Sequence, residues 1–180
     1  MISKFPHALG ALALMTTTVT LATSTLAQEA SSNRVAANTD WSVFVEEDPS
    51  ECWAVSAPKE TVNSRDGQVV SVRRGEILLF VFYRPVADVN GQVTFTGGYP
   101  FASGSTAKLD IGGTKYDLFT EGEWAWPATP EDDARIVAAM KRGSVARILA
   151  ESDRGTVTDD TFSLIGFTAG VEEAVNRCSS

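Results

Sequence analysis

From Trp41 to the end, the sequence is a succession of short strand-like segments separated by turn signals. Apolar and polar residues alternate in several of these segments, and turn dipeptides such as Asp66-Gly67, Asn90-Gly91 and Gly112-Gly113 separate some of them. Many short strands with few helices are typical of two packed layers of antiparallel sheet. The pattern predicts a mainly β fold, and we expect a β-sandwich. The expected strands are 41–46, 52–56, 69–72, 77–83, 93–96, 107–111, 115–119, 121–126, 146–151 and 161–167.

One amphipathic helix is well marked at about 130–142. Thr129 is in position to cap its first turn, Pro130 suits the first helical position, and Gly143 ends it. Ile136 and Met140 fall on one face, which we expect to be buried. A short C-terminal helix is expected at 169–177, after a cap at Thr168.

The first residues have the pattern of a secretory signal peptide. Lys4 precedes an apolar stretch at 8–22, and Ala27 ends a run of small residues suited to cleavage. A membrane-spanning helix needs about 20 apolar residues, and this threonine-rich stretch is shorter. We therefore expect a signal peptide over 1–27, a flexible leader over 28–39 and one β-sandwich domain over 40–180.

The composition limits the partners that such a chain could have. The formal net charge is −8, which disfavours binding to the phosphate backbone of nucleic acids. We expect no nucleic-acid partner and no integral membrane segment after processing. The predicted location is the periplasm, with display on the cell surface or secretion as alternatives.

Two cysteines, Cys52 and Cys178, lie near the two ends of the predicted domain. In an oxidising compartment an isolated pair is most simply a structural disulfide. The sequence has no C-x-x-C motif, which disfavours a redox-active pair. We predict a Cys52–Cys178 disulfide.

The single histidine, His7, lies in the predicted signal peptide. The mature chain would therefore lack the imidazole that Ser-His-Asp and Cys-His nucleophiles and most zinc, copper and iron sites use. We expect no catalytic residues, no metal site and no cofactor.

Three segments, 96–113, 132–143 and 161–178, follow one another in an order that resembles the invasion-associated locus B family of exported bacterial proteins. The segment at 163–168, Ser-Leu-Ile-Gly-Phe-Thr, is the most specific part of the likeness. The resemblance implies a periplasmic or surface β-sandwich, a virulence-associated family and an unknown envelope or host protein as partner. Many members have further cysteines where this chain reads Glu-Gly-Glu-Trp-Ala-Trp at 121–126, so a second disulfide is not expected here.

Two alternatives to a non-enzymatic, contact-making protein remain open. Tyr99, Phe101, Trp124 and Trp126 could form an aromatic platform for a glycan or peptidoglycan, although tryptophans are more often core residues. On a single strand, the carboxylates of residues 121 and 123 would point the same way, as a hydrolase with paired carboxylates could use.

Overall fold

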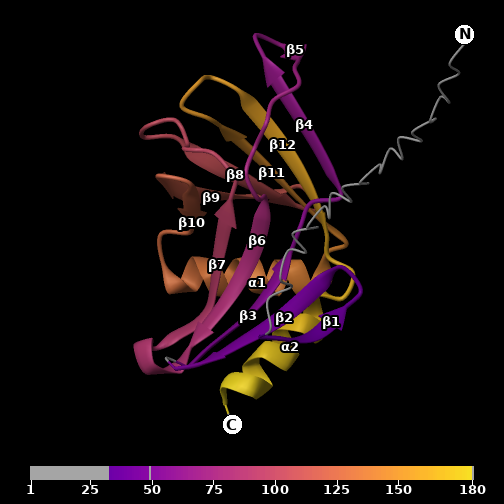
Figure 1. Cartoon of the computed structure of the whole chain (residues 1–180), viewed down its shortest axis with the longest axis vertical. Helices are drawn as coiled ribbons and strands as arrows, with labels where there is room; N and C mark the ends of the chain where they lie inside the picture. The colour runs from indigo at the N-terminus through magenta and orange to yellow at the C-terminus, as the bar shows by residue number, and fades with distance from the viewer. Residues whose placement is uncertain (1–32, 49, 180) are drawn as a thin grey trace, which may run out of the picture. The chain divides into compact units, whose positions relative to one another are not determined.

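The computed structural model describes residues 33–48 and 50–179. The predicted signal peptide lies outside these residues. The described chain contains twelve strands, one 3-10 turn and two α-helices (Figure 1). They are β1 (Arg34–Asn38), β2 (Trp41–Glu47), β3 (Ser50–Ser56), β4 (Glu60–Arg65), β5 (Gln68–Val69), β6 (Leu78–Arg84), η1 (Pro85–Ala87), β7 (Val89–Thr96), β8 (Thr106–Ile111), β9 (Thr114–Glu121), β10 (Trp124–Trp126), α1 (Pro130–Arg142), β11 (Val145–Glu151), β12 (Val157–Ser163) and α2 (Phe167–Cys178).

All twelve strands belong to one antiparallel sheet. Its order is β1-β2-β3-β6-β7-β10-β9-β8-β11-β12-β4-β5, so the sheet is open, with β1 and β5 at its edges. The mainly β prediction is confirmed, but a sandwich of two separate sheets is not. The reason is the short strand β10, which pairs with β7 on one side and with β9 on the other and so joins the two halves.

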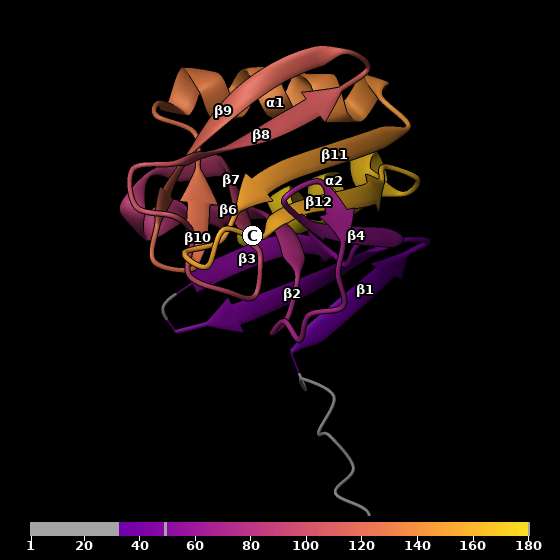
Figure 2. The same ribbon diagram turned by 90° about the horizontal axis from the view of Figure 1, so that it is seen from above.

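The sheet curls so that one face encloses the core. Phe95 on β7 and Phe162 on β12 are five strands apart along the sheet, yet their rings meet edge to face with centroids 6.1 Å apart. Figure 2 shows the β1–β3 part of the sheet facing the β8–β12 part. The inner face is built from fully buried side chains such as Val81, Leu109 and Ile148.

Two helices complete this core. α1 packs against β7, and α2 packs against β2, β3 and the neighbouring strands. Ile136 and Met140 on α1 are fully buried, as the sequence predicts, and Thr129 caps the helix by accepting a hydrogen bond from the Asp132 N–H. On α2, Phe167 meets Trp41 of β2 edge to face with ring centroids 4.8 Å apart. Neither helix of the described ranges has the length and apolar character needed to cross a membrane.

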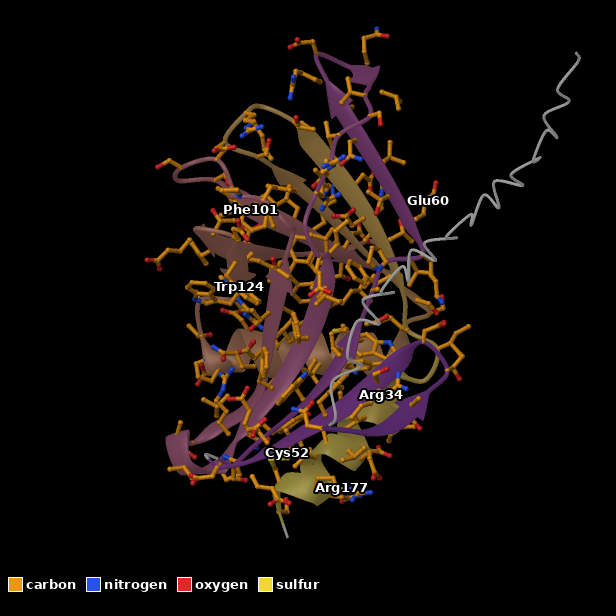
Figure 3. All side chains as sticks on the ribbon, viewed as in Figure 1. Arg34, Cys52, Glu60, Phe101, Trp124 and Arg177 are labelled. Carbon is orange, nitrogen blue, oxygen red and sulfur yellow. A yellow bond between two sulfur atoms is a disulfide. The ribbon has the colours of Figure 1, made fainter. Side chains whose placement is uncertain are left out.

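The predicted disulfide is present. Cys52 is buried on β3 and Cys178 ends α2, with their Cα atoms 5.8 Å apart. Figure 3 shows Cys52 close to the C-terminal helix. The bond fastens the last helix to the β2–β3 hairpin.

Several expected boundaries need correction. Residues 34–38, within the expected flexible leader 28–39, form β1, which pairs with β2. β4 was not expected either, because its residues are polar and largely exposed, so no apolar alternation marks it. Both strands owe their order to pairing with a neighbour rather than to their own sequence. The expected strand 161–167 lies earlier, at 157–163, and α2 begins at Phe167 after Gly166 rather than after a Thr168 cap.

Candidate functional site

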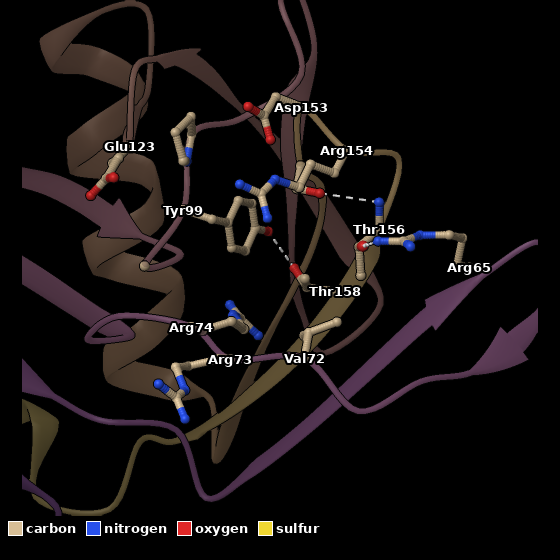
Figure 4. A pocket seen from close by; sticks show the side chains of 13 residues that line it. Arg65, Val72, Arg73, Arg74, Tyr99, Glu123, Asp153, Arg154, Thr156 and Thr158 are labelled. Carbon is tan, nitrogen blue, oxygen red and sulfur yellow. Dashed lines mark hydrogen bonds between the residues drawn. The ribbon is translucent and has the colours of Figure 1, made fainter.

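A cavity of about 490 Å³ opens beside the β11–β12 turn (Figure 4). Four arginines and two acidic residues line its wall. The lining residues are Arg65, Val72, Arg73, Arg74, Gly98, Tyr99, Pro100, Glu123, Ser152, Asp153, Arg154, Thr156 and Thr158. We call this cavity the arginine pocket.

A close approach of two backbone segments positions one side of the arginine pocket. The Gly75 N–H donates to the Gly98 carbonyl oxygen at 2.8 Å. Gly98 has a φ of +71°, and a Cβ there would lie 2.6 Å from the Gly75 backbone. Only glycine fits both the conformation and the space. The contact holds Arg73 and Arg74 against the end of β7.

Arg74 forms the rigid floor of the pocket. Its guanidinium binds the Asp160 carboxylate through two hydrogen bonds, of 2.8 and 2.6 Å. It also donates to the Gly97 carbonyl oxygen and to the Asn63 side chain. The Arg74 and Asp160 side chains are only 6% and 0% exposed, so loss of either partner would leave a buried charge, at a cost of about 3–5 kcal/mol.

Tyr99 lies over this floor. The Arg74 guanidinium sits 4.9 Å from the centroid of the Tyr99 ring, and the Tyr99 hydroxyl shares a hydrogen bond with the Thr158 hydroxyl. Burial raises the pKa of the Tyr99 hydroxyl above its usual range, so it stays protonated at neutral pH. Tyr99 therefore presents a neutral polar group, not a phenolate.

The remaining arginines of the pocket are exposed. Arg65 donates one hydrogen bond to the Thr156 hydroxyl at 2.7 Å. Arg73 and Arg154 make no hydrogen bond or ion pair with residues 33–48 or 50–179. The pocket thus combines a fixed floor with guanidinium groups that are free to bind a ligand.

A second feature lies on the outer face of the sheet, the face that points away from the core. Five aromatic rings follow one another across β2, β3, β6 and β10, with successive ring centroids 5.6, 6.0, 5.1 and 6.0 Å apart. In order they are Phe44, Trp53, Phe82, Phe80 and Trp124, and we call them the aromatic ladder. The Phe44–Trp53 and Trp53–Phe82 contacts are directly cross-strand pairs.

The structure separates the four aromatic residues predicted to form one platform. Phe101 is buried and packs against Phe95 of the core, and Tyr99 packs on Phe101 inside the arginine pocket. Trp124 is 44% exposed and ends the aromatic ladder. Trp126 is half-buried two residues further along β10. Figure 3 shows Phe101 and Trp124 at different levels of the sheet.

The paired-carboxylate geometry is wrong. Glu121 ends β9, Gly122 has a φ of +58°, and β10 begins only at Trp124, so a tight turn separates the two carboxylates. Both residues are exposed, and only Glu123 reaches the arginine pocket. The two carboxylates therefore do not lie on one face of a single strand, which the predicted geometry required.

Sequence reasoning missed both surfaces for identifiable reasons. The four arginines come from three segments, at Arg65, at Arg73 and Arg74, and at Arg154, so no local motif reveals them. Part of the aromatic ladder was detectable in residues 77–83. Residues 78, 80 and 82 alternate onto one face of this strand, and two of them, Phe80 and Phe82, are aromatic.

The comparisons with known proteins give one structural likeness. No family model and no curated protein matches the sequence. Among solved structures, the chain is similar to the crystal structure of invasion associated protein B from Bartonella henselae. The TM-score is 0.54 with 14% sequence identity over 81% of this chain and 98% of the other. The structure therefore agrees with the resemblance carried by the sequence motifs, and the chain has the fold of invasion associated protein B.

Proposed function

We propose that this chain is an exported, non-enzymatic relative of invasion associated protein B that acts through contacts in the periplasm or cell envelope. The fold likeness and the disulfide support export and kinship. The observation that carries the contact-making role is the aromatic ladder on the outer face of the sheet. The partner that we propose for the aromatic ladder is an envelope or host protein with an apolar surface.

The physical argument rests on where the rings lie. Large aromatic side chains are enriched in the centres of protein interfaces, where they supply much of the binding energy. Here five of them adjoin on the outer face of the sheet, where Trp124 is 44% exposed, Phe44, Trp53 and Phe82 are half-buried, and Phe80 is 9% exposed. The ladder also has a charged border, because the Arg84 guanidinium lies 4.4 Å from the Phe82 ring centroid and binds Glu51. An apolar centre with a polar rim is the usual composition of a binding surface.

Affinity capture from envelope fractions tests this role. We expect the oxidised wild type to retain a specific envelope protein, and the Trp53→Gln and Trp124→Gln variants to lose it. Leu149→Gln is the matched control, because Leu149 is 43% exposed on β11, outside the ladder. Equal capture by all variants would contradict the ladder as the contact surface. Turnover of a substrate that a point mutation abolishes would refute the non-enzymatic role.

A glycan is the second candidate ligand, and the exposed Trp124 ring favours it. The apolar faces of sugar rings stack on flat aromatic side chains, and Trp124 stands beside Phe80 with its centroid 6.0 Å away. Tryptophan fluorescence during titration with peptidoglycan fragments should shift in the wild type and shift less in Trp124→Phe. The same titration with no shift in the wild type removes this candidate.

A further inference from the structure

We propose that the arginine pocket binds a small ligand through a phosphate or carboxylate group. This inference is independent of the proposed function, because it concerns another surface and would hold whether or not the aromatic ladder binds a partner.

Charge is the first argument. The chain has 15 basic against 23 acidic residues, yet the wall of this one cavity contains four arginines, Arg65, Arg73, Arg74 and Arg154. Its acidic residues are Glu123 and Asp153; in Figure 4, Asp153 lies beside Arg154 above the Tyr99 ring, whereas Arg73 and Arg74 lie below the ring. Because Asp160 neutralises Arg74, three arginines remain against these two carboxylates, and the wall keeps a positive excess in a chain that is negative overall. A local positive excess attracts anionic ligands.

The second argument is that the four arginines differ in how many of their N–H groups are already bound within the protein. Asp160 neutralises Arg74 and fixes it, so Arg74 positions Tyr99 and the surrounding backbone. Arg73 and Arg154 have no partner within the described ranges, and Arg65 uses one of its five N–H groups. Guanidinium groups match the paired oxygens of phosphates and carboxylates, and such charge-assisted bonds are about twice as strong as neutral ones.

The third argument is the set of neutral hydroxyl groups beside these cations. Thr156 and Thr158 are buried at the back of the pocket, and the Tyr99 hydroxyl stays protonated there. Hydroxyl groups donate and accept hydrogen bonds, so they can orient a polar ligand that the arginines attract. A volume of about 490 Å³ is within the range of small-molecule sites.

Calorimetric titration of the oxidised full chain with pyrophosphate and with citrate, at constant ionic strength, tests the proposal. We expect saturable binding of at least one of the two probes. The double variant Arg73→Gln/Arg154→Gln should bind about tenfold more weakly, because it loses two charge-assisted contacts. Arg142→Gln, at the exposed end of α1, is the control for a general change of charge and should bind like the wild type.

Each outcome bears on the proposal. Binding of pyrophosphate alone identifies a phosphate ligand, binding of citrate alone identifies a carboxylate ligand, and both support the pocket. A second experiment uses vesicles that contain phosphatidylglycerol. If the protein sediments with the vesicles and pyrophosphate prevents this, the anion is a lipid headgroup. If the protein binds pyrophosphate but does not sediment with the vesicles, the ligand is soluble. Absence of saturable binding to either probe, or equal weakening by Arg142→Gln, would overturn the proposal.

Discussion

Asp133 is a buried carboxylate on a helix whose other inward-facing residues are apolar. It lies on α1, where it is 8% exposed, and its side chain accepts a hydrogen bond from the Val93 N–H on β7 at 2.8 Å. β10 pairs with β7 only at Phe95 and Thr96, so this stretch of β7 has no strand beside it on that side. Asp133 therefore takes the place of a missing strand partner, at the cost of placing a carboxylate in the core.

Because burial of the Asp133 carboxylate is unfavourable, the free energy of unfolding should depend on pH. Burial raises the pKa of Asp133 to about 6 from an ordinary value of 3.8. Below pH 3.8 the group is protonated in both the folded and unfolded states, and its contribution to stability is fully present. As the pH rises to 6 the unfolded chain loses this proton first, so the contribution falls, and it is lost above pH 6.

Asp133→Asn should therefore increase the free energy of unfolding at pH 7 by about 1–2 kcal/mol, because it keeps an acceptor for Val93 and removes the charge. Urea unfolding of both proteins from pH 4 to pH 8 measures the effect. The gain should grow between pH 4 and 6 and stay constant above that. A gain independent of pH, or a loss at pH 7, would contradict the assignment.

Other residue-scale features follow from context that the sequence does not contain. Asp159 and Asp160 are neighbours on β12 and look alike in the sequence. Asp159 pairs with Arg147, which is 60% exposed, whereas Asp160 is fully buried against Arg74. An exposed pair of the first kind contributes about 0–1 kcal/mol, and breaking the second would cost several times more. Alternation predicts opposite faces for the two, but only the fold shows which face is the core.

At the scale of elements, glycine explains the most specific sequence motif. Gly166 precedes α2 with a φ of +90°, and a Cβ at this position would lie 1.9 Å from the carbonyl oxygen of Asn38. The Asp40 N–H bonds to the Ile165 carbonyl oxygen in the same contact. The 163–168 segment is therefore the place where the start of α2 meets the β1–β2 turn.

Gly166→Ala should lower the free energy of unfolding by at least about 2 kcal/mol, because it combines an unfavourable φ with a clash against backbone. Gly113→Ala is the matched control: its φ is +88°, but no atom lies within 4 Å of the added Cβ. It should cost about 1 kcal/mol. Chemical unfolding of the two variants compares them, and equal losses would show that crowding at Asn38 is unimportant.

The elements that could be predicted were those with local signals. α1 has a cap, a proline at its start and an apolar face, and its bounds agree with the expected 130–142. β1 and β4 have no such signals, because tertiary pairing alone stabilises them. The joining of the two halves by β10 could not be predicted, since it depends on two residue pairs between segments about thirty residues apart.

At the scale of the whole molecule, the disulfide is the main covalent constraint. Cys52 and Cys178 are 126 residues apart, and closing a loop of that length removes much of the entropy of the unfolded chain. The sequence predicted this pairing because the two cysteines had no alternative partner. The arginine pocket, by contrast, exists only once the sheet has curled, so no sequence pattern could predict it.

Replacing both cysteines, as Cys52→Ala/Cys178→Ala, should lower the free energy of unfolding by about 2–5 kcal/mol. Thermal unfolding should show the same direction when the wild type is reduced, whereas reductant should leave the double variant unchanged. Equal melting temperatures for the oxidised and reduced wild type would mean that the bond contributes little to stability.

The same bond makes a covalent ring of everything from β3 to the end of α2. The hairpin turns at Gly113, Gly122 and Gly155 all lie within this ring. If a protease nicks the backbone at one of them, both new ends remain tethered through the sulfurs, and no fragment leaves the molecule. A single cleavage that would divide a chain without this bond into two fragments here leaves one covalently connected molecule, and the two fragments separate only when a reductant breaks the disulfide.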